Sequence, residues 1–334
     1  MTMQFGIYFP PVGHFERRSE KSEERNLILL EYADKLGFDY AWFAEDFLDN
    51  SQSPSQDMNL ISVATDLTQN IKIGTGIARP SNKKVLSLAN QIARLDSITR
   101  ERIAFGIGPG FLPPDSPHIG ISNVEFDSLV SCIEMAKSKL IDRALEQQHN
   151  RLSSNHRGQK NVYLMPAKIF VASQSSPIAA VLGGRFGLGM LTLGAVTTNG
   201  FNNLPYIWEL YEKNARKNEH ICDRARWSLT LPMHLAETNI DARRDVEFGL
   251  KQWVRELQEN TTFVIPKESN SVDQIIETGL GVIGTHVDAT RKIRELQQQS
   301  GGFGCLLLTA HNWVDLERSK QSLKIFQDYI VNAV

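Results

Sequence analysis

The segment from residue 71 to residue 107 decides the fold. It contains two short apolar runs, IKIGTGI at 71–77 and IAFGI at 103–107. Between them, apolar residues recur at helical spacing, at Val85, Leu88, Ala89, Ile92 and Leu95. The runs show no clean alternation of apolar and polar residues, which favours strands that are buried on both faces of a parallel sheet. The segment therefore predicts one β-α-β unit.

The same unit recurs in both directions along the chain. Eight apolar runs, each followed by a helical pattern, lie at residues 5–9, 40–44, 71–77, 103–107, 169–172, 190–193, 227–236 and 303–308. Eight such units without a linker favour a (β/α)8 TIM barrel over a doubly wound sheet. We therefore predict an α/β fold with a single TIM-barrel domain over residues 1–334. Irregular segments at 109–122 and 258–281 are expected to be loops inserted at its C-terminal face, and the polar stretch 147–160 a surface excursion.

Composition excludes several classes of protein. The 334 residues carry 36 Lys and Arg against 38 Asp and Glu, so the formal net charge is −2. Nucleic-acid binding needs a basic face, and this balance does not indicate one. No apolar run approaches the ~20 residues that cross a bilayer, and the N-terminal residues do not read as a secretory signal. The three scattered cysteines fit a reducing compartment. We expect a cytoplasmic protein that binds neither nucleic acid nor membrane.

Titratable side chains follow two of the predicted strands. The active sites of TIM barrels lie at the C-terminal ends of the strands, which singles out Glu45 and Asp46 after the second strand and His311 after the eighth. Adjacent carboxylates could supply a general base with a hydrogen-bonding partner, and a neutral histidine could act as an acid or a base. A solvated loop pair and a structural histidine are the alternatives. No metal-ligand motif accompanies these residues, so no metal site is predicted.

Two further segments could contact an anionic ligand. The glycines of 106–110 do not fit the dinucleotide fingerprint, because the chain continues into Phe111-Leu112-Pro113-Pro114, which cannot propagate a helix. Ser175-Ser176-Pro177 is the better candidate. Pro177 suits the first helical position and Ser176 the N-cap, so hydroxyls and free amides would converge after the fifth strand. Plain capping of the helix is the alternative.

Taken in order, these segments resemble the luciferase-like monooxygenases, flavin-dependent barrel proteins related to bacterial luciferase. The resemblance spans nearly the whole chain, and the order and spacing of its motifs are more specific than any one motif. The segments that carry it are 36–45 (LGFDYAWFAE), 71–76, 95–99, 102–110 (RIAFGIGPG), 171–177, 187–189, 282–285 and 301–308.

The resemblance implies an oxidoreductase that uses reduced FMN and dioxygen to oxygenate a small organic substrate. A separate flavin reductase would supply the reduced FMN, and the family suggests a homodimer. Glu45 and Asp46 would orient the reactants or exchange protons, with His311 as a second candidate base.

The resemblance also implies a flavin site. It places one group of residues beside the flavin ring and another near the flavin phosphate, and it implies a cis peptide bond between Gly76 and Ile77. The ring group is Thr75, Gly76 and Ile77; the phosphate group is Gly110, Phe111, Ser175 and Ser176.

Two positions depart from the family pattern. Many members have Glu-His-His after the second strand, where this chain has Glu45-Asp46-Phe47, and luciferases place an arginine where this chain has Pro109. Phosphate binding must then rest on amides, hydroxyls and Arg79 or Arg185, and we expect weaker flavin affinity. Two alternatives stay open: a deazaflavin-dependent hydride-transfer enzyme, whose second strand ends in Asp-His-Phe, and a non-catalytic flavin-binding member.

Overall fold

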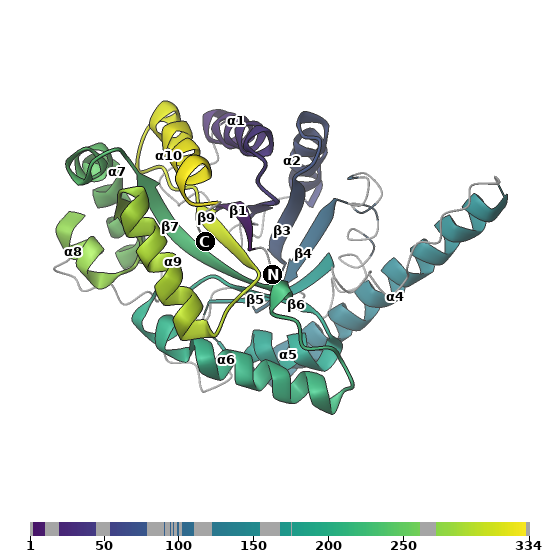
Figure 1. Cartoon of the computed structure of the whole chain (residues 1–334). Helices are drawn as coiled ribbons and strands as arrows, with labels where there is room; N and C mark the ends of the chain where they lie inside the picture. The colour runs from purple at the N-terminus through teal and green to yellow at the C-terminus, as the bar shows by residue number, and fades with distance from the viewer. Residues whose placement is uncertain are drawn as a thin grey trace.

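Eight parallel strands close into a barrel that helices surround (Figure 1). The computed structural model describes residues 3–10, 20–44, 54–78, 90, 94, 96, 99, 102–109, 122–153, 168–174, 176–260 and 272–331. The ring runs β1–β2–β3–β4–β5–β6–β7–β9 and closes from β9 onto β1. Its strands are β1 (Gln4–Phe9), β2 (Tyr40–Phe43), β3 (Lys72–Ala78), β4 (Ile103–Ile107), β5 (Ile169–Ser173), β6 (Gly189–Thr192), β7 (Trp227–Leu235) and β9 (Cys305–Thr309). The predicted TIM barrel is confirmed.

One strand lies outside the ring. β7 pairs with β9 from Ser228 to Pro232, and from Met233 onward it pairs with β8 (Val282–Gly284) instead. The last residues of β7 therefore leave the barrel wall. β8 is not among the predicted strands, and the loop predicted over 258–281 is wrong for residues 272–278, which form α8 (Val272–Thr278). A strand of three residues and a helix of seven are too short to show a periodic pattern.

The helices pack around the ring. They are α1 (Glu20–Leu36), α2 (Pro54–Leu67), α4 (Asn123–Ser153), α5 (Ile178–Phe186), α6 (Thr198–Lys217), α7 (Asn239–Asn260), α8, α9 (His286–Ser300) and α10 (Leu316–Tyr329). The far end of α4 projects away from the barrel (Figure 1). Residues 147–153 of the predicted surface excursion at 147–160 form the end of this projecting helix, and the rest of the segment lies outside the described residues. The polar residues of this segment do not suggest a helix by their pattern, but residues 144–148 (ALEQQ) are all good helix formers.

Large aromatic side chains fill the interior of the barrel, and a glycine on the neighbouring strand makes room for them. Trp42 is fully buried, and its ring lies 2.2 Å from where a Cβ on Gly74 would stand. The same ring meets Phe170 edge to face, with the ring centroids 5.3 Å apart. Position 74 must therefore be glycine for Trp42 to fit. The inside of the barrel is a packed hydrophobic core and not an open channel.

Two side chains fix the start of β3. The Asp34 carboxylate accepts hydrogen bonds from the backbone N–H groups of residues 69–71 at 2.7–3.0 Å. The Arg102 guanidinium donates to the backbone carbonyls of Thr65 and Thr68 at the end of α2 and to that of Ile71, the residue before β3. Burial acts to raise the pKa of Asp34, but the three backbone hydrogen bonds hold it below its ordinary value. These contacts set the register of the strand that leads to the predicted flavin site.

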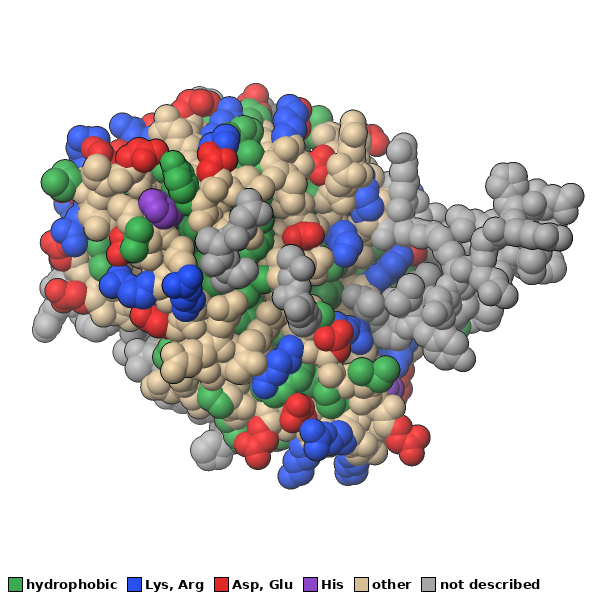
Figure 2. Space-filling view, in the orientation of Figure 1, with side chains coloured by type: hydrophobic (Ala, Val, Ile, Leu, Met, Phe, Trp, Pro, Cys, Tyr) green, Lys and Arg blue, Asp and Glu red, His purple; other side chains and the backbone are tan. Residues whose placement is uncertain are grey.

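The surface carries mixed charge. Acidic and basic side chains lie interspersed over the face seen in Figure 2. Among the helices of the described ranges, none combines the length and the apolar composition needed to span a membrane.

Candidate active site

The C-terminal ends of β3, β4 and β5 approach one another closely. A Cβ on Gly76 would lie 2.4 Å from the carbonyl oxygen of Gly106, and one on Gly108 would lie 2.1 Å from that of Ala172. Only glycine allows three backbones to come this near. The predicted site residues on β3 are therefore separated by one strand, β4, from β5, the strand that leads to Ser176.

The end of β3 is irregular, but its peptide bonds are ordinary. The predicted cis bond between Gly76 and Ile77 is wrong, because every peptide bond in the described ranges is trans. Instead, Gly76 adopts φ +141°, and the register with β4 shifts between Thr75 and Ala78. Glycine tolerates this conformation, so the backbone absorbs the irregularity there. The shift brings Ile77 into the apolar cluster inside the barrel, whereas Thr75 is buried in register with Phe43 and Phe105.

The chain after β5 forms a compact turn into α5. Ser173 Oγ donates to the carbonyl of Ser176 at 3.0 Å, and Ser176 Oγ accepts from the N–H of Ile178 at 3.3 Å. Pro177 already has helical angles, φ −60° and ψ −13°. The N-cap residue of α5 is therefore Pro177 and not Ser176 as predicted, although the Ser176 hydroxyl still accepts from the first helical residue. Anion binding there stays a prediction. Arg185 lies in the last turn of α5, at the end away from Ser176, so it does not serve that site.

Gln174 is a candidate site residue that lies among residues 173–176 after the fifth strand but that no sequence motif singles out. It follows Ala172 by two residues, and its carbonyl accepts from the N–H of Gly194 after β6 at 2.8 Å. Its Nε2 is buried and has no hydrogen-bond partner among the described residues. An unsatisfied buried donor costs about 1–3 kcal/mol, so a ligand that accepts this hydrogen bond would recover that cost. A single polar residue at the end of an apolar strand does not by itself indicate a ligand-binding site.

His311 lies two residues beyond β9, within an aromatic cluster. Its ring stacks on Trp313 with the centroids 4.7 Å apart, and Trp253 lies 4.9 Å away. Part of the residue reaches the surface, but Nε2 is buried and has no hydrogen-bond partner in the described structure. Burial, aided by the charge of Arg25, lowers the pKa of His311 to about 3. The ring is therefore neutral at pH 7, and its pKa is far from that of an effective general base.

The remaining predicted site residues lie outside the described residues. They are Glu45, Asp46, Gly110, Phe111 and Ser175. Arg79, the other candidate for the phosphate, also lies outside them.

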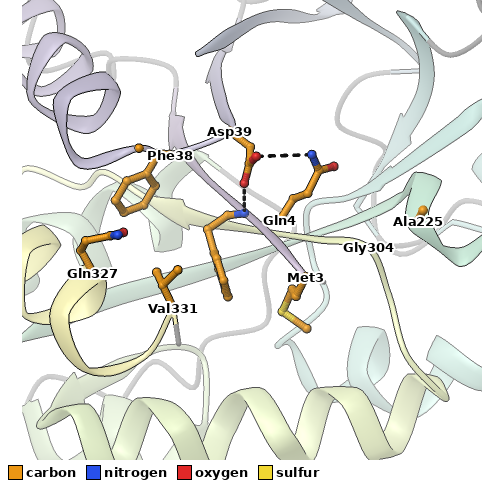
Figure 3. Close-up of a pocket in the computed structure, with 10 residues that line it drawn as sticks. Met3, Gln4, Phe38, Asp39, Ala225, Gly304, Gln327 and Val331 are labelled. Atoms are coloured by element: carbon orange, nitrogen blue, oxygen red, sulfur yellow. Dashed lines mark hydrogen bonds between the residues drawn. The ribbon is translucent and has the colours of Figure 1, made fainter. Parts of the chain in front are cut away.

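A cavity of about 420 Å³ lies at the opposite end of the barrel (Figure 3). Its lining includes Gln4 at the start of β1 and Gly304 just before β9. The Asp39 carboxylate already accepts from the N–H of Phe5 at 3.0 Å and from the Gln4 amide at 3.4 Å. Since barrel enzymes work at the C-terminal end, this cavity is not the candidate active site.

The described part of the site suits a neutral organic cofactor with an anionic tail. Gln174 and Ser176 offer uncharged polar groups, α5 begins at the same turn, and Ile77 belongs to the buried apolar cluster inside the barrel. Within the described ranges, no group of three His, Cys, Asp or Glu side chains could hold a metal ion. The orphaned amide of Gln174 fits a flavin because FMN carries phosphate, hydroxyl and carbonyl oxygens that accept hydrogen bonds.

Known proteins resemble this chain along its whole length. Limonene 1,2-monooxygenase from Rhodococcus erythropolis is 28% identical, with 98% of this chain and 86% of that protein aligned. The oxygenating constituent of 3,6-diketocamphane monooxygenase from Pseudomonas putida, a type II Baeyer-Villiger enzyme solved with FMN, shares the fold at TM-score 0.76 and 20% identity, covering 100% and 99% of the two chains. The coenzyme F420-dependent tetrahydromethanopterin reductase of Methanopyrus kandleri shares it at TM-score 0.66 and 16% identity, covering 99% of each chain.

A family model agrees with these likenesses. The model described as luciferase-like monooxygenase matches residues 3–301, which include every barrel strand except the last. The chain belongs to the luciferase-like monooxygenase family.

Proposed function

We propose that this protein is a monooxygenase that uses reduced FMN and dioxygen to oxygenate a small organic substrate. The observation that carries the proposal is the full-length similarity to a limonene 1,2-monooxygenase, at 28% identity over 98% of the chain. The shared fold with an FMN-bound Baeyer-Villiger enzyme supports the choice of cofactor. Reduced FMN, when bound, supplies the electrons for oxygen activation.

The protein's own residues hold the reactants and exclude water. Ser176 and the N-terminus of α5 bind the flavin phosphate, and Ile77 packs against the flavin ring. Glu45 and Asp46 orient the substrate or exchange its protons. His311 is neutral at pH 7 because its pKa is near 3, so it serves as an uncharged ring of the aromatic cluster and not as a general base. A dry site would delay the competing, unproductive release of the activated oxygen as hydrogen peroxide.

The substrate is small, uncharged and largely apolar. The side chains of the inner cluster toward the C-terminal end of the barrel include Ala44, Ile77, Ala172 and Leu193, none of which carries charge. A charged substrate would lose hydration against these apolar side chains. The similarity to an enzyme named for limonene, an apolar hydrocarbon, points to the same class.

The test is an anaerobic titration of the purified protein with reduced FMN, followed by addition of dioxygen with and without limonene as an apolar probe. Flavin absorbance reports binding and reoxidation, and mass spectrometry reports oxygen insertion. We expect FMN binding and a product heavier by one oxygen atom. A parallel titration with deazaflavin separates the alternative, since preferential deazaflavin binding with no oxygenated product would refute the monooxygenase.

Two partners complete the proposal. With FMN and NADH alone the protein should turn over only after a flavin reductase is added, because no reductase activity is expected of the barrel itself. A second copy of the chain is expected as well, and sedimentation velocity should report twice the chain mass of 37.6 kDa.

A further inference from the structure

Two hydroxyl groups lie on the inner wall of the barrel near its C-terminal end, on the neighbouring strands β1 and β9. Tyr8, the second-last residue of β1, belongs to the buried cluster inside the barrel together with Ile77. Thr309, the last residue of β9, lies opposite Tyr8 in the register of the two strands. It shares a face of β9 with Leu307, which belongs to the same inner cluster. Tyr8 and Thr309 are each only 7% exposed, so both hydroxyls lie on a largely apolar wall.

The hydroxyl of Tyr8 is a donor without a partner. Neither it nor the hydroxyl of Thr309 makes a hydrogen bond within the described part of the chain. The backbone there is fixed on both sides, because the Ala310 N–H donates to the Tyr8 carbonyl at 2.8 Å and the Ala44 N–H donates to the Phe9 carbonyl at 2.9 Å. Burial raises the pKa of Tyr8, so its hydroxyl stays protonated and can donate. Buried tyrosines usually direct this group to a partner, which points to a ligand that accepts.

The two hydroxyls lie across the barrel from the proposed site of the flavin phosphate. In the order of the ring, β1 is opposite β5 and β9 is opposite β4. The proposed phosphate site, with Ser176 and the start of α5, follows β5. The wall that carries Tyr8 is therefore available to the substrate.

We infer that the Tyr8 hydroxyl donates a hydrogen bond to an oxygen atom of the substrate, and that the substrate is a small ketone. The inference rests on the proposed function and names the polar group of its largely apolar substrate. A carbonyl oxygen accepts a hydrogen bond and brings no hydrogen that would need an acceptor of its own. Thr309 adds a second hydroxyl to the same wall. Tyr8 is thus a specificity-determining residue.

The experiment measures the binding of two probes of the same shape, cyclohexanone and methylenecyclohexane, in which a CH2 group replaces the carbonyl oxygen. Isothermal titration calorimetry gives both dissociation constants, for the flavin-free protein and with oxidised FMN present, without any turnover. Tyr8→Phe removes only the hydroxyl. We expect it to weaken the binding of cyclohexanone roughly 3- to 10-fold, the effect of one neutral hydrogen bond. The affinity for methylenecyclohexane should change less than about twofold.

A second measurement separates binding from folding. Tyr8→Phe should leave the thermal midpoint of the flavin-free protein equal to or above that of the wild type, because its hydroxyl has no partner to lose. The matched control is Tyr211→Phe, at a buried tyrosine of α6 whose hydroxyl donates to the carbonyl of Leu188 at 3.0 Å. This control should lower the thermal midpoint and bind cyclohexanone as the wild type does.

Each remaining outcome would overturn the inference. Unchanged cyclohexanone affinity in Tyr8→Phe, equal losses for the two probes, or a wild type that does not bind cyclohexanone would each do so. A lower thermal midpoint of flavin-free Tyr8→Phe would assign the hydroxyl a structural role instead. A loss of FMN affinity in this variant beyond about twofold would assign the hydroxyl to the flavin. Failure of the wild type to bind FMN would refute the proposed function itself, and the titrations of the flavin-free protein distinguish that result from the others.

Discussion

Replacing His311 with phenylalanine should make the folded protein less sensitive to acid. The substitution keeps a ring against Trp313 and Trp253, whose centroids lie 4.7 Å and 4.9 Å from that of His311. It removes the buried Nε2 that has no partner in the described structure. The variant therefore isolates the titration of one group from the packing around it.

The magnitude follows from the shift in pKa. Burial and the charge of Arg25 lower the pKa of His311 from 6.5 to about 3 in the folded protein. Below pH 6.5 the unfolded chain gains a proton on this residue that the folded chain does not, so its contribution to stability is complete above pH 6.5 and falls as the pH drops toward 3. One pH unit is worth about 1.4 kcal/mol. Between pH 7.5 and pH 5.0 the wild type should therefore lose up to about 2 kcal/mol through His311.

The assay is urea unfolding followed by tryptophan fluorescence at pH 7.5 and 5.0. His311→Phe should lose up to about 2 kcal/mol less than the wild type over this interval. The control is His286→Phe, which replaces another stacked histidine, 4.6 Å from Tyr329, and retains His311. Its acid-induced loss should still include the contribution of His311. Equal losses in the wild type and in His311→Phe would refute the buried, neutral histidine on which the reasoning depends.

Three further substitutions test the packing that positions the site. Trp42→Ala empties the centre of the barrel and should lower the free energy of unfolding by about 3–5 kcal/mol in urea titrations. Asp34→Ala leaves the N–H groups of residues 69–71 without their acceptor and should cost about 1–3 kcal/mol in the same assay. Gly249→Ala places a Cβ 2.5 Å from the carbonyl oxygens of residues 312–313, so it should cost about 1–3 kcal/mol and alter the near-ultraviolet circular dichroism of Trp313.

Some features of the candidate site could be predicted from the sequence, and others could not. Ser176 and Pro177 were predictable as a helix start because capping depends on neighbours in the chain. Gln174 was not, since what distinguishes it is an amide nitrogen without a hydrogen-bond partner among the described residues, once β4, β5 and β6 lie side by side. His311 was predicted as a candidate base, but its depressed pKa comes from burial and from Arg25, a residue 286 positions away.

The sequence by itself determined the barrel. Each of its eight strands is a local apolar run followed by a helical stripe, and short-range periodicity suffices to show both. The tertiary structure decided the departures from this regular pattern and the charge state of the site. β7 leaves the ring after Pro232 to pair with β8, Gly76 absorbs a register shift through its backbone without a cis bond, and distant side chains set the charge state of His311. Such features depend on contacts between segments far apart in the chain, which local periodicity does not encode.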